Sequence, residues 1–139
     1  MNPIRYYSTN NTSERVTFET ALMKGLASNY GLYMIAREDI PRLKASTIEV
    51  MRDLSYAQIA FEVLYPFLQE EIGRNDLEVI LEDAYSDTAI PTTIQQVTGS
   101  TFILWLSHGP TYSFKDYAAR FFARILNYFL KRSGNKRVV

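Results

Sequence analysis

The chain has 139 residues, which is enough for one domain with its own core and too few for two large ones. Lysine and arginine number 15, as do aspartate and glutamate, so no net positive charge favours nucleic-acid binding. The absence of cysteine excludes disulfides and thiolate metal sites, and a single histidine excludes a multi-histidine metal site. We therefore expect a globular protein with neither a metal nor a nucleic-acid partner.

The sequence has no apolar run of the length that a membrane-spanning helix needs. Its first five residues lead into Tyr-Tyr-Ser-Thr and not into the apolar core of a signal peptide. We expect a cytoplasmic protein with no membrane partner.

Short extended and helical patterns alternate in the first third of the chain. Residues 4–8 are aromatic and lie between a proline and a polar run, which predicts a strand at a sheet edge. An apolar stripe at four-residue steps predicts a helix over residues 17–27. We expect a turn at 29–31, a short apolar segment at 32–35 and irregular structure at 40–43.

The middle of the chain is predicted to be helical. Apolar residues recur at helical spacing from Ser46 or Thr47 to Leu54. Ser55 is a suitable N-cap for the next helix, and Pro66 is expected to kink that helix or to start a new turn.

Gly73 is expected to end this helical segment, because glycine favours helix exits. Asn75 or Asp76 is then predicted to cap a further helix whose apolar residues extend to Ala84, and residues 86–91 are predicted to form a loop.

Two strands are predicted before the last helix. Residues 94–97 suit a short strand and residues 98–100 a turn. Residues 101–106, TFILWL, form a continuous apolar run of strand length, which predicts a buried strand.

The last helix has the clearest pattern. From Phe114 onward, apolar residues at three-four spacing predict one buried face over four turns. They are Tyr117, Ala118, Phe121, Phe122, Ile125, Leu126, Phe129 and Leu130. Ser113 and Asp116 have the spacing of a variant capping box, and Ser133 and Gly134 are expected to end the helix.

Val138 and Val139 follow this helix and have the character of a strand start. A strand, a helix and a second strand form a βαβ unit, so we expect the chain to be truncated within one. The alternative is a frayed terminus, which is common.

Lys115 is the residue with the clearest chemical potential, because a lysine amine can form an imine with an aldehyde cofactor. Burial and the positive end of a helix dipole both disfavour the ammonium form, and both can act in the first turn of a helix. Taken alone, a lysine near a helix start is more often solvated, and His108 in a loop is more often a hydrogen-bonding residue than a ligand or base.

The stretch LSHGPTYSFKDYAARFFARIL, residues 106–126, resembles the cofactor-lysine segment of threonine synthases. A second block resembles the amino-terminal part of that family, in the same order and spacing from about residue 4 to residue 130. Its matching segments are Arg5 to Thr9, Gly25 to Ala27, Gly31 to Met34 and Ile40 to Leu43. Tyr30 stands where many relatives have glycine, and Ile35 where proline is common.

The resemblance implies a fold-type II pyridoxal-phosphate enzyme of the α/β class related to the β subunit of tryptophan synthase. For this chain it implies a helix-rich α+β fragment with a few short strands. Residues 1–100 would form an amino-terminal domain, and residues 101–139 the truncated start of the cofactor-binding domain.

The implied reaction is a lyase step of threonine biosynthesis, in which O-phosphohomoserine and water give L-threonine and phosphate. By the same resemblance, Lys115 would hold the cofactor and shuttle protons, and Phe114 would pack against the pyridine ring. The residues that would line the site are Ser107, His108, Thr111 and Ser113.

The six glycines of the chain do not form the glycine-rich loop that cradles a cofactor phosphate. We therefore expect weak or absent binding of pyridoxal phosphate and no catalysis by these residues alone. The alternatives are a complete small helical interaction domain and another fold-type II eliminase, such as a threonine or serine dehydratase. Exposed apolar surface on residues 102–106 would favour the truncated enzyme, and would allow self-association.

Overall fold

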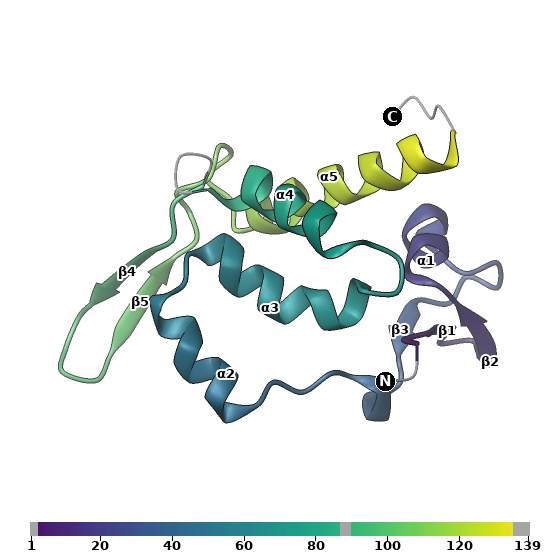
Figure 1. Ribbon diagram of the computed structural model, residues 1–139, viewed down its shortest axis with the longest axis horizontal. Helices are drawn as coiled ribbons and strands as arrows, with labels where there is room; N and C mark the ends of the chain where they lie inside the picture. Colours follow the sequence, from purple (N-terminus) through teal and green to yellow (C-terminus); the bar gives the residue numbers. More distant parts are fainter. Residues whose placement is uncertain (1–2, 87–89, 135–139) are drawn as a thin grey trace.

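The computed structural model describes residues 3–86 and 90–134. The molecule is elongated (Figure 1). A small sheet with one helix lies at one end, a helical layer forms the middle, and a two-stranded hairpin projects at the other end. The mixture of helices with short strands confirms the helix-rich α+β class.

The amino-terminal sheet has the order β2-β1-β3, and all its pairs are antiparallel. Its strands are β1 (Tyr6–Ser8), β2 (Asn11–Val16) and β3 (Tyr33–Ile35). The strand predicted over residues 4–8 is confirmed, but its position at the edge was wrong, because β1 is the central strand. Strand β2 was not predicted, because its residues are mostly exposed and polar and so lack the apolar alternation of a half-buried strand.

The predicted first helix is α1 (Phe18–Lys24). Thr17 is its N-cap, and the Thr17 hydroxyl accepts a hydrogen bond of 3.1 Å from the Thr20 backbone N–H. Gly25 ends the helix with a φ of 72°, a conformation that favours glycine.

The turn between α1 and β3 leaves no room for a side chain at Gly31. Ser8 is fully buried, and its hydroxyl donates to Asn29 Oδ1 at 2.7 Å while accepting from the Asn10 N–H at 3.2 Å. A Cβ atom on Gly31 would lie 2.1 Å from Ser8 Oγ. Tyr30 precedes it with a φ of 64°, a left-handed conformation that glycine adopts at lower cost.

The predicted helix up to Leu54 is α2 (Ala45–Val50), which continues as a 3₁₀ turn over Met51–Asp53. The next helix is α3 (Tyr56–Leu68), and Ser55 is its N-cap, as predicted. The Ser55 hydroxyl accepts from the Gln58 N–H at 3.2 Å and the Ser55 N–H donates to Gln58 Oε1 at 2.9 Å, which completes a capping box.

Helix α3 runs through Pro66 to Leu68 as one element, so of the two predictions for this proline, a kink or a new turn, the start of a new turn was wrong. Gly73 is the N-cap of α4 (Arg74–Tyr85) and does not end the preceding helix, contrary to our prediction. The expectation that Asn75 or Asp76 caps α4 was also wrong, because the backbone is already helical from Arg74.

The hairpin that projects from the helical layer consists of β4 (Thr93–Gln96) and β5 (Phe102–Trp105), which pair antiparallel. Both predicted strands and the turn between them are confirmed. The predicted burial of residues 101–106 was wrong, because β5 side chains range from 38% exposed at Trp105 to 58% at Phe102. Within the described residues, β4 is the only strand paired with β5.

Helix α5 (Lys115–Ser133) ends at Gly134, whose φ of 67° confirms the predicted glycine exit. It packs against α4 and contacts α1 (Figure 1). Its buried face is narrower than predicted, because Phe122 is 50% exposed and does not belong to the core. The fully buried core side chains include Leu77, Leu81, Ile90, Ile125 and Phe129.

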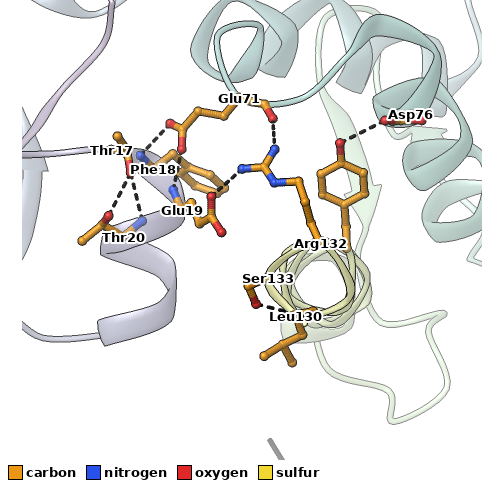
Figure 2. A network of polar contacts seen from close by, with 10 residues as sticks. Thr17, Phe18, Glu19, Thr20, Glu71, Asp76, Leu130, Arg132 and Ser133 are labelled. Atoms are coloured by element: carbon orange, nitrogen blue, oxygen red, sulfur yellow. Dashed lines mark hydrogen bonds and ion pairs between the residues drawn. The ribbon is translucent and has the colours of Figure 1, made fainter. Parts of the chain in front are cut away.

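A polar cluster ties the two ends of the described chain together (Figure 2). The Glu71 carboxylate accepts hydrogen bonds from the Phe18 N–H at 2.7 Å and the Glu19 N–H at 2.9 Å, so it supplies acceptors to the first turn of α1. Arg132 of α5 donates to the Glu71 backbone carbonyl at 2.5 Å and forms an ion pair with Glu19. The cluster fixes the end of α5 against α1.

No helix in residues 3–86 and 90–134 is long and apolar enough to cross a membrane. The strand start predicted at Val138 and Val139, and part of the loop predicted over residues 86–91, lie outside the described residues.

Candidate functional site

The predicted site residues lie on one continuous segment between the end of β5 and the start of α5. Lys115 is the first residue of α5, so its predicted place in the first turn of a long helix is confirmed. The segment connects the end of β5 in the projecting hairpin to the start of α5, which packs beside α4 (Figure 1).

A tight turn over residues 109–112 lies in the middle of this segment. The Tyr112 N–H donates to the Gly109 carbonyl at 3.0 Å, and Pro110 occupies the second position, which its fixed φ suits. Tyr112 has a φ of 58°, an uncommon conformation for a residue with a side chain. Such strain persists only where surrounding contacts hold it, and it often marks functional segments.

Asp116 folds back from α5 onto this turn. Its carboxylate accepts from the Thr111 N–H at 2.8 Å and from the Thr111 hydroxyl at 2.6 Å. These hydrogen bonds, first that of the Thr111 hydroxyl, hold the pKa of the Asp116 carboxyl below its usual value. Asp116 is 7% exposed, and a Cβ on Gly109 would lie 2.4 Å from Asp116 Oδ2, so the glycine is required for this close approach.

The side chains of Ser113 and Asp116 do not form the predicted capping box. The Ser113 hydroxyl accepts from the Lys115 N–H at 3.3 Å, while the Asp116 carboxylate is directed to Thr111. Phe114 is the N-cap residue by position and makes no side-chain cap. The Asp116 carboxylate therefore accepts hydrogen bonds from the turn and does not cap the helix.

His108 stacks on Trp105 of β5, with ring centroids 6.0 Å apart and an interplanar angle of 8°. His108 is exposed and Ser107 is half-buried. This contact extends the hairpin surface toward the turn, and it places His108 on the side of the segment that faces β5.

Lys115 and Phe114 both lie at the surface. Lys115 is exposed, so the described residues do not bury it, and its exposure agrees with the solvated lysine that is more common near a helix start. Phe114 is 66% exposed, which leaves a large apolar ring beside the lysine with no partner layer among those residues. The first residue of α5 is therefore an exposed lysine, and an exposed aromatic residue precedes it.

Tyrosines anchor the start of α5 to the core. Tyr117 is 7% exposed, its hydroxyl donates to the Pro91 carbonyl at 2.7 Å, and its own carbonyl accepts from the Tyr85 hydroxyl at 2.7 Å. The Tyr56 ring lies edge-on to those of Tyr85 and Tyr117, with centroids 4.9 and 6.0 Å away. Burial raises the pKa of Tyr85 to about 12.

Sequence reasoning missed the role of Asp116 and the anchoring tyrosines. The spacing of Thr111 and Asp116 gave no signal, because a bond between a loop and the following helix turn has no fixed period. Tyr56 and Tyr85 are far from Lys115 in sequence, so only the packing of α3 and α4 brings them under α5.

A surface hollow of about 550 Å³ lies elsewhere, between α3 and α4. Its lining includes Phe61, Glu62, Arg74 and Val79 and none of the predicted site residues. Among the described residues no group of three or more metal-ligating side chains could hold a metal ion.

Comparison with known proteins agrees with the resemblance noted in the sequence. The family model described as "Threonine synthase N terminus" matches residues 5–85. The chain is 36% identical to the threonine synthase of Pseudomonas aeruginosa over 98% of its own length and 29% of that protein. It is 30% identical to the threonine synthase of Escherichia coli over 97% of the chain and 30% of that protein.

Solved structures give the same result. The PLP-bound threonine synthase from Brucella melitensis matches with a TM-score of 0.84 and 33% identity, over 94% of this chain and 28% of that one. The enzyme from yeast matches with a TM-score of 0.78 and 33% identity, over 93% and 27%. The chain thus spans less than a third of the length of these relatives, and its fold is that of the corresponding part of threonine synthases. On its sequence and its fold, the chain belongs to the threonine synthase family.

Proposed function

We propose that these 139 residues supply the lysine-bearing part of a pyridoxal-phosphate-dependent threonine synthase. The reaction is the lyase step that converts O-phosphohomoserine and water to L-threonine and phosphate. Family membership supports the reaction, and the exposed Lys115 at the start of α5 is the observation that carries the assignment. A cytoplasmic location and a domain division at residue 100 remain predictions.

In this proposal Lys115 is the residue that holds the cofactor, and its amine Nζ accepts and returns protons during the reaction. Phe114 packs against the cofactor ring, which its exposed side chain is free to do. The cofactor, when bound, supplies an electron sink for charge that develops on the substrate. Ser107, His108, Thr111 and Ser113 lie on the same segment and are the proposed lining of the site.

The described residues contain one side of such a site. The six glycines stand singly in the sequence, and none belongs to a glycine-rich loop that could cradle a phosphate. Lys115 and Phe114 are open to solvent, so these residues do not exclude water from the amine. We therefore propose that this chain alone binds pyridoxal phosphate weakly and does not form threonine.

Reductive labelling tests the assignment. The chain is incubated with substoichiometric pyridoxal phosphate, reduced with borohydride and mapped by peptide mass spectrometry. Lys24, Lys44 and Lys131 serve as internal controls, because they share the solvent and the reagent with Lys115. We expect Lys115 to be labelled several times more than each control, at low overall yield. Equal labelling of all four lysines would contradict the role of Lys115.

The activity assay separates the remaining parts of the proposal. Incubation with O-phosphohomoserine and pyridoxal phosphate is expected to release no phosphate above a blank without protein. Release of phosphate together with formation of threonine in this assay would show that the chain is competent by itself, and would overturn the statement that it is not.

A further inference from the structure

We propose that the Asp116–Thr111 contact is a positioning device for Lys115, in which Asp116 holds the preceding turn and is itself kept away from the lysine amine. This inference rests on the proposed function, because that function makes Lys115 the cofactor lysine. Asp116 and Thr111 are positioning residues here, and neither is assigned contact with the reacting atoms.

The first argument is the geometry of the carboxylate. Its Oδ2 accepts from the Thr111 N–H at 2.8 Å and its Oδ1 accepts from the Thr111 hydroxyl at 2.6 Å. One residue of the turn therefore occupies both oxygens. Charge-assisted hydrogen bonds of this length are strong, and a pair of them fixes the direction of the carboxylate as well as its position.

The second argument is close packing. A Cβ atom on Gly109 would lie 2.4 Å from Asp116 Oδ2 and 2.8 Å from Asp116 Cβ. The turn thus rests directly on the Asp116 side chain. The left-handed φ of 58° at Tyr112, next to Thr111, is a conformation that such contacts must maintain.

The third argument concerns where the turn is held. Asp116 stands between Lys115 and Tyr117, and Tyr117 is anchored to the core through the Tyr85 hydroxyl at 2.7 Å. The first turn of α5 is therefore a fixed base. Asp116 connects this base to the turn, so that Thr111 and the residues beside it keep one position relative to Lys115.

The fourth argument concerns charge. A carboxylate paired with a lysine amine favours the ammonium form, which cannot act as a nucleophile. Asp116 is adjacent to Lys115 in sequence, yet the ion pairs formed within the described residues involve neither of them. The two bonds from Thr111 direct the carboxylate back to the turn and leave the lysine amine without that partner.

Substitutions at Thr111 test the device without altering Lys115 or Asp116. Thr111→Val keeps the shape of the side chain but removes the hydroxyl donor, and Thr111→Ser keeps the donor. The measurement is the labelling of Lys115 by pyridoxal phosphate and borohydride, divided by that of Lys24, Lys44 and Lys131 in the same digest. It is repeated from pH 6 to pH 10.

We expect Thr111→Val to lower this ratio by about tenfold, which is less than the roughly hundredfold that a full 1 Å misplacement costs a positioned reaction, because the Thr111 N–H bond remains. Its labelling should also require a higher pH, because the carboxylate, then held by the Thr111 N–H alone, can turn its released oxygen toward the cations beside it, Lys115 and Arg120, and stabilise the ammonium form. Thr111→Ser should remain within about twofold of the natural chain. A purely structural role would leave the pH profile unchanged.

The outcomes distinguish the two proposals. If Lys115 is labelled selectively in the natural chain and equally selectively in Thr111→Val, the positioning role is overturned and the proposed function is left intact. A natural chain without selectivity for Lys115 would overturn both. If Thr111→Val does not fold, the Thr111 amide proton of the natural chain is followed by NMR while Asp116 titrates. It should shift with a midpoint below that of an ordinary carboxyl, and its failure to titrate would overturn the contact.

Discussion

Replacement of Gly31 by alanine tests how the amino-terminal sheet is locked to the turn that follows α1. The added Cβ would lie 2.1 Å from Ser8 Oγ and 2.9 Å from the Asn10 backbone nitrogen, where ordinary contacts begin at 3.4 Å. The serine hydroxyl must therefore move, and the backbone nitrogen cannot rotate away.

The magnitude follows from the contacts that this shift breaks. The hydroxyl of Ser8 makes hydrogen bonds of 2.7 Å with Asn29 and 3.2 Å with Asn10, and each is worth about 1 kcal/mol. Overpacking of a buried site adds about 1–3 kcal/mol, and the lower chain entropy of alanine returns about 0.5 kcal/mol. We expect a loss of about 3 kcal/mol in the free energy of unfolding, or roughly 10 °C in Tm for a chain of this size.

Urea denaturation followed by circular dichroism measures this change. Gly99→Ala is the matched control, because its Cβ would meet nothing within 4 Å and it lies in the turn of the β4–β5 hairpin, at the opposite end of the molecule from the amino-terminal sheet (Figure 1). The control should change the unfolding free energy by less than about 0.5 kcal/mol. Equal effects of the two substitutions would refute the argument from close packing.

Four further changes have defined outcomes. Tyr30→Gly should raise the unfolding free energy by about 1 kcal/mol in urea denaturation, because it relieves the left-handed φ of 64°, and a loss would contradict this. Glu71→Gln should lower the free energy of unfolding by about 1–2 kcal/mol, because the start of α1 loses a charged hydrogen-bond acceptor. Glu70 makes no such bonds to α1, so Glu70→Gln should leave the free energy of unfolding unchanged. The Tyr85 hydroxyl should ionise only near its pKa of about 12 in ultraviolet titration. This pKa lies above that of a tyrosine in the unfolded chain. The contribution of the Tyr85 hydroxyl to the free energy of unfolding is therefore complete below about pH 10 and is lost as the pH rises toward 12. A Tyr85→Phe variant should lack this part of the pH dependence. Leu104→Lys on the exposed β5 should reduce any self-association seen by light scattering, and unchanged association would exclude the hairpin as its surface.

Local patterns predicted those features that depend on near neighbours in sequence. Ser55 caps α3 because its partner Gln58 is three residues away, and Gly134 ends α5 because glycine adopts the φ that the exit requires. The strand character of residues 101–106 was evident from their composition. The burial of these residues was not, because burial depends on which layers cover the strand.

Features that depend on distant segments could not be predicted from local patterns. The central position of β1 required β2 and β3 to pair with it from both sides. The supply of acceptors to α1 by Glu71 joins residues 53 positions apart, and the ion pair of Glu19 with Arg132 joins residues 113 positions apart. No periodicity in the sequence records such contacts.

By itself the sequence determined the family, the helices and most strands, and the place of Lys115 at the start of the last helix. Two separate motifs in the right order are enough to indicate the family. Hydrophobic periodicity is enough to predict the helices, most strands and the position of Lys115. Only the tertiary structure decided that Lys115 and Phe114 are exposed, that Asp116 is bound to Thr111 and that tyrosines from α3 and α4 support α5. The physical reason is that exposure and side-chain pairing are set by segments that approach in space, and their approach is a property of the whole packed chain.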